Sequence, residues 1–169
     1  MRERRSNSED KADLYTPEER VRRDATAWTL VQGALAPLQF LAFGISLALI
    51  VRFLMTGQGE GAAVVSVMVK TAFLYAIMVT GAFWEKAVFG RYLFAPAFFW
   101  EDAVSMIVIA LHTLYMVLCV GHLATVPVQF LVALAAYASY CVNAAQFVWK
   151  FSLAKRGRPA RQVRSEALA

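Results

Sequence analysis

Four long apolar stretches dominate the chain, over residues 28–55, 63–84, 103–120 and 126–149. Each is close to the roughly 20 residues that a helix needs to cross a hydrocarbon core about 30 Å thick. Each should be helical, because a segment in lipid has to satisfy its own backbone hydrogen bonds, and the stretches are too long for barrel strands. The pattern predicts an all-α, polytopic membrane protein built as a bundle of four transmembrane helices.

The same pattern divides the chain into three parts. A polar N-terminal segment covers residues 1–27, a membrane domain covers residues 28–150, and a basic tail covers residues 151–169. In the first part, Thr16 suits a helix N-cap, the proline after it suits the first helical position, and Glu19 completes a capping box. This motif predicts a short cytoplasmic helix that leads into the first membrane helix.

Composition agrees with a membrane protein and locates the charge. Of 169 residues, 59% are hydrophobic, which leaves too few polar residues to cover a water-soluble globule. Seven bases balance seven acids before residue 28, and four balance four from there to residue 149, so the net charge of +5 lies in the tail that starts at Lys150. A basic tail directly after a membrane helix indicates contact with anionic lipid headgroups and argues against a nucleic-acid partner.

The positive charges also predict an orientation. The N-terminal segment, the loop after the second helix and the C-terminal tail hold fifteen of the seventeen Lys and Arg residues, whereas residues 56–62 and 121–125 hold none. Positive charge is retained on the cytoplasmic side of a membrane. Both termini and the long loop are therefore expected in the cytoplasm.

No motif for a metal or a cofactor is apparent. Cys119 and Cys141 lie inside predicted helices without paired spacing, which favours a packing role over a disulfide or a metal site. The glycine-rich turn over residues 56–61 lacks the Lys-Ser or Lys-Thr that follows in a phosphate loop. We expect no cofactor.

The loop between the second and third helices is rich in aromatic residues and has acids at both ends. One interpretation is a belt of rings at the membrane interface. The other is the mouth of a site for a large, flat amphiphile, because aromatic walls stack on a conjugated ring. In the second interpretation, the candidate binding residues of this segment are Trp84, Arg91, Tyr92, Phe98, Phe99 and Trp100.

Polar residues follow one face of three predicted helices. These stripes are Glu101, Ser105, His112 and Tyr115; Ser139, Asn143, Gln146 and Lys150; and Gln32, Gln39 and Ser46. They could hydrogen-bond one another and hold the bundle together, which is the preferred interpretation for the serines. They could also line a site, with Gln39, Asn143 and Gln146 as candidate binding residues. His112 fits an interior structural histidine, a proton donor or acceptor, or a ligand to a metal carried by a pigment. Lys70 is expected to extend outward to the interface.

Three segments, residues 14–40 (LYTPEERVRRDATAWTLVQGALAPLQF), 70–113 (KTAFLYAIMVTGAFWEKAVFGRYLFAPAFFWEDAVSMIVIALHT) and 135–147 (AAYASYCVNAAQF), carry a resemblance to a known family. The chain resembles the 3-vinyl (also called 2-vinyl) bacteriochlorophyllide hydratases of phototrophic bacteria. The resemblance implies an enzyme of bacteriochlorophyll synthesis that adds water across the vinyl group of a chlorophyllide or bacteriochlorophyllide to give a 1-hydroxyethyl group. It also implies a multi-pass protein of the bacterial inner membrane, either cytoplasmic or intracytoplasmic, near other pigment-synthesis enzymes.

Hydration of a vinyl group needs an acid, a positioned water molecule and a base, and the only metal is the magnesium that the chlorin substrate carries. Glu85, Glu101 and Asp102 cluster at one predicted interface, and neighbouring acids held partly out of water suit proton donation. We expect Glu101 or Glu85 to donate the proton and Asp102 or His112 to orient the water. One alternative is a pigment-binding or photosystem-assembly protein that holds a chlorin without chemistry, and another is a small four-helix carrier or an auxiliary membrane subunit.

Overall fold

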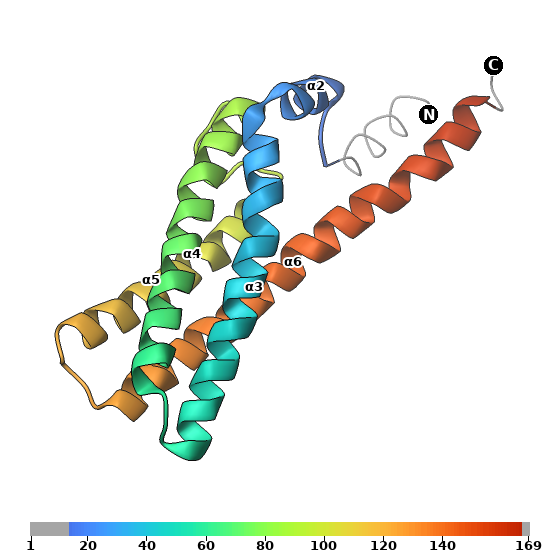
Figure 1. Cartoon of the computed structure of the whole chain (residues 1–169). Coiled ribbons are helices and arrows are strands. Elements are labelled where there is room, and N and C mark those ends of the chain that lie inside the picture. The colour runs from blue at the N-terminus through green and yellow to red at the C-terminus, as the bar shows by residue number, and fades with distance from the viewer. Residues whose placement is uncertain (1–13, 167–169) are drawn as a thin grey trace.

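The computed structural model describes the chain from residue 14 to residue 166, and its side chains from residue 14 to residue 152. Residues 1–13 and 167–169, which belong to the predicted N-terminal segment and basic tail, lie outside this description. All regular structure in residues 14–166 is helical (Figure 1). The helices are α2 (Pro17–Ala25), α3 (Ala27–Thr56), α4 (Glu60–Phe89), α5 (Phe99–Val120) and α6 (Val126–Glu166).

Four of these helices are long and apolar enough to cross a membrane, as the sequence predicts. The spans are Ala27–Thr56, Glu60–Phe89, Phe99–Val120 and Val126–Ser152. The second and third helices are longer than the predicted apolar stretches, because each also includes charged residues at the end that meets the long loop. The helix α4 stops at Gly90, whose φ of 82° suits the left-handed C-terminal position that glycine favours.

The short helix α2 begins with the predicted capping box, which is confirmed. The Thr16 side chain accepts a hydrogen bond from the Glu19 backbone, and the Glu19 carboxylate accepts one from the Thr16 backbone. At the other end of α2, the Arg22 Nε donates to the Val88 carbonyl at 2.8 Å. This bond fastens α2 to the end of α4.

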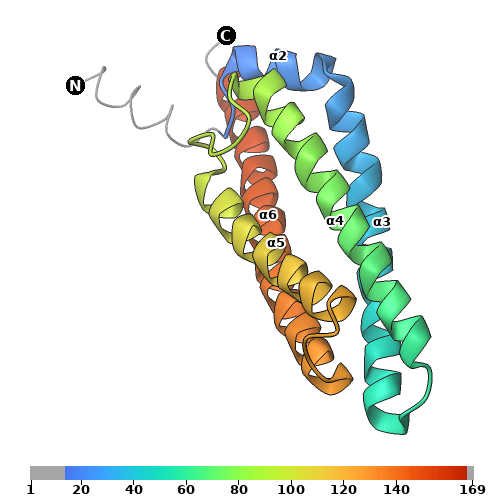
Figure 2. The ribbon, with the colours of Figure 1, turned by 90° about the vertical axis from the view of Figure 1, so that its left-hand side faces the viewer.

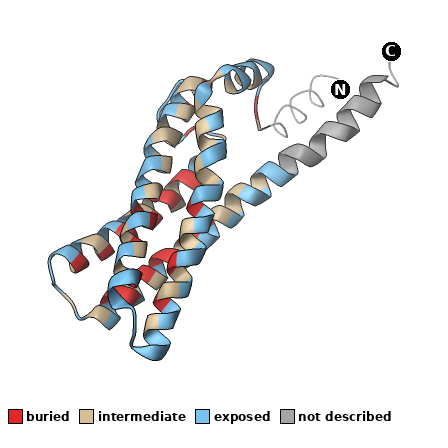
Figure 3. Cartoon of the chain, in the orientation of Figure 1, coloured by how far each residue is buried: buried red, intermediate tan, exposed pale blue. Residues whose placement is uncertain are grey.

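The membrane helices form two antiparallel pairs, α3 with α4 and α5 with α6, and contacts between the pairs are fewer than contacts within them. Figure 2 shows the two pairs side by side, with α2 lying across one end. The α4–α5 loop and the C-terminal part of α6 lie at the α2 end, and the α3–α4 and α5–α6 turns lie at the opposite end. Most residues on the outer surfaces are exposed or intermediate, and the buried residues lie along the helices where they pack together (Figure 3).

The pairs pack against each other at the end that carries the two turns. A hydrophobic cluster there includes Ile50, Val67 and Phe130 from three helices. A polar bridge crosses beside it, in which the Tyr137 hydroxyl donates to Ser46 at 2.6 Å and Ser46 bonds Ser66 at 2.8 Å. The bridge is the helix-to-helix hydrogen bonding expected for Ser46. Towards the α2 end the pairs enclose a cavity instead.

Candidate active site

The cavity between the two helical pairs has a volume of about 500 Å³. This is within the roughly 300–1,000 Å³ typical of small-molecule sites. Side chains of every described helix line it, and most of the lining is apolar. A cavity of this kind suits a large, flat, mostly apolar ligand.

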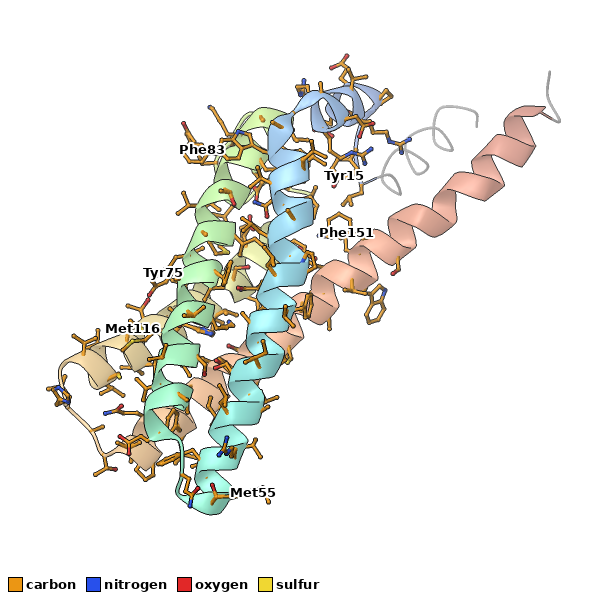
Figure 4. The ribbon with its side chains drawn as sticks, in the orientation of Figure 1. Tyr15, Met55, Tyr75, Phe83, Met116 and Phe151 are labelled. Carbon is orange, nitrogen blue, oxygen red and sulfur yellow. The ribbon has the colours of Figure 1, made fainter. Side chains whose placement is uncertain are left out.

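The cavity runs from the α2 end of the molecule towards the middle of the bundle. Tyr15 lines its mouth close to α2, and Phe151 of α6 lines it further from α2 (Figure 4). Its floor is a small apolar cluster of Leu74, Val108 and Tyr140. On α4, Glu85 lies eleven positions after Leu74, so this wall is about 16 Å long at 1.5 Å per residue.

The cavity also opens sideways between α3 and α6. Phe40 of α3 and both Val148 and Phe151 of α6 line the cavity and are exposed on the surface of the protein. Figure 1 shows α6 diverging from α3 towards the α2 end. The side opening therefore lies within the apolar spans of these two helices.

Two acids, Glu85 of α4 and Asp102 of α5, lie next to each other in the wall of the cavity. Both line the cavity and both are buried. The Glu85 Oε2 accepts a hydrogen bond from the Ala95 backbone at 3.2 Å, and the Asp102 Oδ2 accepts one from the Phe94 backbone at 2.7 Å. The two carboxyl groups also interact directly with each other. Such a pair holds one proton more readily than two negative charges, because two ionised groups repel each other.

The loop over residues 90–98 gives the two backbone donors their positions. It starts at Gly90, and Phe94 has a φ of 57°, a left-handed conformation that is uncommon for residues other than glycine. The Phe98 amide then bonds the Ala95 carbonyl at 2.8 Å and closes the turn before α5. Strained backbone of this kind tends to occur at functional sites, and here it directs two successive amides at the two acids.

The third candidate acid, Glu101, does not line the main cavity. Its carboxylate pairs with the Lys150 Nζ at 2.5 Å, and Lys150 also donates to the Ala97 carbonyl. Glu101 and Lys150 line a smaller hollow of about 250 Å³ together with Gln146, another predicted binding residue. The structure thus places Glu85 and Asp102 in one site and Glu101 in another.

The aromatic residues of the long loop fall into two groups. Trp84 and Phe98 line the cavity, and their rings pack against each other with centroids 5.6 Å apart. The other candidates, Arg91, Tyr92, Phe99 and Trp100, do not line it. They lie on the surface, with Tyr92 54% and Trp100 72% exposed, as expected for a belt of side chains at a membrane interface.

Polar side chains occupy the inner part of the cavity. Asn143 donates to the Ser105 hydroxyl at 2.6 Å and to the Glu101 carbonyl at 3.2 Å, which joins α6 to α5. Gln39 also lines the cavity and is only 2% exposed. Neither polar atom of its amide has a hydrogen-bond partner among the described residues. A buried amide in this state is suited to bind a ligand's polar group.

His112 lies beneath the cavity floor and does not line the cavity. Its Nδ1 donates to the Val108 carbonyl at 2.7 Å, so its Nε2 is free to accept the hydrogen bond from the Lys70 Nζ, also 2.7 Å long. Lys70 is fully buried, and its Nζ lies 4.2 Å from the centre of the Tyr140 ring. The expectation that Lys70 extends outward was wrong, because His112 and the ring of Tyr140 hold its ammonium group inside the bundle.

Several cavity residues lie outside the sequence-based prediction. The ring of Tyr15 stacks on Phe89 with centroids 5.8 Å apart and joins Trp84 and Phe98 in one aromatic cluster. Arg23 of α2 lines the cavity as well. The capping box reveals α2 in the sequence, but no periodic signal shows that α2 folds back over the bundle. Within residues 14–152, no group of three His, Cys, Asp or Glu side chains is arranged to hold a metal ion.

Comparison with known proteins identifies the family of the chain. The family described as 2-vinyl bacteriochlorophyllide hydratase matches residues 15–153 of the chain. A protein of that name from Rhodobacter capsulatus is 64% identical over 143 residues, which cover 84% of this chain and 82% of the relative. Another, from Cereibacter sphaeroides, is 59% identical over 150 residues, which cover 88% of this chain and 92% of the relative. No solved structure matches the chain. The matched region covers most of the chain and contains the whole cavity. The chain therefore belongs to the 2-vinyl bacteriochlorophyllide hydratase family.

Proposed function

We propose that this protein adds water across the vinyl group of a bacteriochlorophyllide and so forms its 1-hydroxyethyl derivative. The observation that carries the proposal is the carboxyl pair, Glu85 and Asp102, buried in the wall of a large apolar cavity. Curated relatives that share most of the chain bear the name of this activity. The reaction class is that of a hydro-lyase.

The cavity suits the macrocycle. Its aromatic wall, with Trp84 and Phe98, offers ring faces and edges to a conjugated plane. The unpartnered amide of Gln39, near the floor, offers donors and an acceptor to polar substituents on the ring. A macrocycle bound along this wall brings one edge to the two acids.

Glu85 is the proton donor in this proposal. It lies about one turn before the C-terminal end of α4, where the helix dipole disfavours a negative charge, whereas Asp102 lies in the first turn of α5, where the dipole favours one. Asp102 also has the shorter bond from a backbone amide. The single proton of the pair therefore resides on Glu85 and the negative charge on Asp102.

The steps then balance with water as the only co-substrate. Glu85 gives its proton to the terminal vinyl carbon, forming a C–H bond and leaving a cation on the inner carbon that the macrocycle delocalises. Water attacks the inner carbon, and Asp102 accepts the proton that the water loses. Transfer from Asp102 to the neighbouring Glu85 carboxylate then restores the starting state. Each turnover consumes one vinyl group and one water.

The surroundings of the enzyme follow from the charge pattern. We place the long loop and both termini in the cytoplasm of a bacterium and the helices in its inner membrane, since fifteen of the seventeen Lys and Arg residues belong to these segments of the sequence. The basic tail would contact anionic lipid headgroups. Substrate and product are amphiphiles, so neighbouring pigment-synthesis enzymes in the same membrane are the expected source and destination.

The activity can be tested with membranes that contain this protein as the only added enzyme. A vinyl bacteriochlorophyllide should gain the mass of one water, and its long-wavelength absorption band should shift to the blue, without added nucleotide, metal or reductant. In heavy-oxygen water, the product hydroxyl should carry the label. Label from dioxygen, or strict dependence on a reductant, would exclude a hydratase. Pigment retained unchanged in a stoichiometric complex would favour the pigment-binding alternative.

A further inference from the structure

We propose that Arg23 binds the free carboxylate of the substrate's propionate side chain and so selects the free acid over its esters. This inference rests on the proposed function, since a bacteriochlorophyllide is the pigment without its esterifying alcohol. The assignment makes a residue of the short helix α2 a determinant of substrate specificity.

Arg23 is the only Lys or Arg among the described residues that line the cavity. Its side chain is 19% exposed, so it lies mostly inside the mouth while remaining connected to the polar end of the molecule. A carboxylate that enters an apolar cavity has to find an opposite charge or stay in water. Arg23 is placed to meet it at the entrance.

The guanidinium group of Arg23 is held in a fixed position. Its Nε and Nη2 approach Asp24 Oδ1 at 2.8 and 2.7 Å, and its central carbon lies 4.9 Å from the centre of the Tyr15 ring. Tyr15 in turn belongs to the aromatic cluster with Phe89, Trp84 and Phe98. Because a guanidinium has five N–H donors, it can hold Asp24 and still offer donors to a second carboxylate.

Different helices supply the group that binds the carboxylate and the groups that move the proton. Arg23 comes from α2, whereas the acid pair comes from α4 and α5. A carboxylate on Arg23 leaves the macrocycle within the cavity, where its vinyl group reaches Glu85. Binding at Arg23 therefore contributes to substrate affinity without taking part in proton transfer.

The test compares a vinyl bacteriochlorophyllide with its methyl ester, which keeps the macrocycle and removes the charge. The native protein should show a KM for the ester at least about tenfold higher, as expected for loss of a charge-assisted hydrogen bond, with kcat nearly unchanged. Arg23→Gln should raise the KM for the free acid to that of the ester. Arg23→Lys, which keeps the charge without the forked geometry, should fall between them.

Asp24→Asn is the matched control. It removes the same ion pair but keeps the charge of Arg23, so it should not raise the KM for the free acid. A rise equal to that of Arg23→Gln would show a structural role for the pair and overturn the inference. Equal KM values for acid and ester in the native protein would overturn it without any variant. Hydration of neither pigment would overturn the proposed function, and this inference with it.

Discussion

Whether an acidic side chain lines the cavity depends on the direction in which it points more than on its position in the sequence. Glu101 and Asp102 are adjacent, but successive residues of a helix point about 100° apart. As a result, Asp102 lines the cavity next to Glu85, while Glu101 pairs with Lys150 on another side of α5. The sequence places all three acids at one interface, but it cannot decide between Glu101 and Glu85 as the donor.

Replacing the proposed donor tests this assignment. Glu85→Gln keeps the size and polarity of the side chain but removes its acidic proton, so kcat should fall by about 100-fold or more. Glu101→Gln makes the same chemical change outside the cavity and should keep most of the rate. Hydration kinetics, normalised to the amount of protein in the membrane, measure both. A normal rate in Glu85→Gln, or a collapse only in Glu101→Gln, would contradict the assignment.

At the scale of elements, long apolar runs predict the four membrane helices because a span requires such a run. The ends of α4 and α5 are harder to place, since charged residues such as Glu85 and Lys86 stop the apolar pattern without stopping the helix. The polar stripes indicate which face of a helix turns inward, but they do not show which residue of another helix it meets. The positions of Tyr15 and Lys70 depend on side chains of other elements, so their roles could not be predicted from the sequence.

The loop that follows α4 gives a prediction at this scale. Gly90→Ala should strain the loop, because Gly90 has a φ of 82° and a left-handed residue other than glycine costs about 1–2 kcal/mol. No atom lies within 4 Å of the added methyl group, so the effect would come from the backbone alone. The resulting change in backbone conformation should displace the amides that bond Glu85 and Asp102, and kcat should fall.

Gly61→Ala provides the comparison. Gly61 also has open space around it, but it is helical and has no positive φ. Alanine there should leave hydration unchanged and stabilise the helix slightly. Thermal unfolding in detergent and hydration rates should therefore separate the two variants. Equal behaviour of both would mean that the conformation of the loop does not position the acids.

At the scale of the whole molecule, the structure puts the α2 end and the two short turns at opposite ends of the bundle. The charge pattern predicts which end is cytoplasmic. Reporter fusions near Gly59 and Leu123 should be external, and fusions near Arg91 and Arg161 should be internal. An external reporter near Arg91 would overturn the proposed orientation.

The opening between α3 and α6 has a kinetic consequence. Since Phe40, Val148 and Phe151 connect the cavity with the lipid-facing surface, pigment can exchange with the bilayer without crossing water. The enzyme would then respond to the two-dimensional density of pigment in its own membrane. Diluting that pigment with extra lipid in the same vesicles, at a constant total amount, should slow the reaction, whereas diluting the whole suspension with buffer should leave turnover per enzyme unchanged. The supply of substrate to the enzyme would then depend on the area of the membrane over which the pigment is spread.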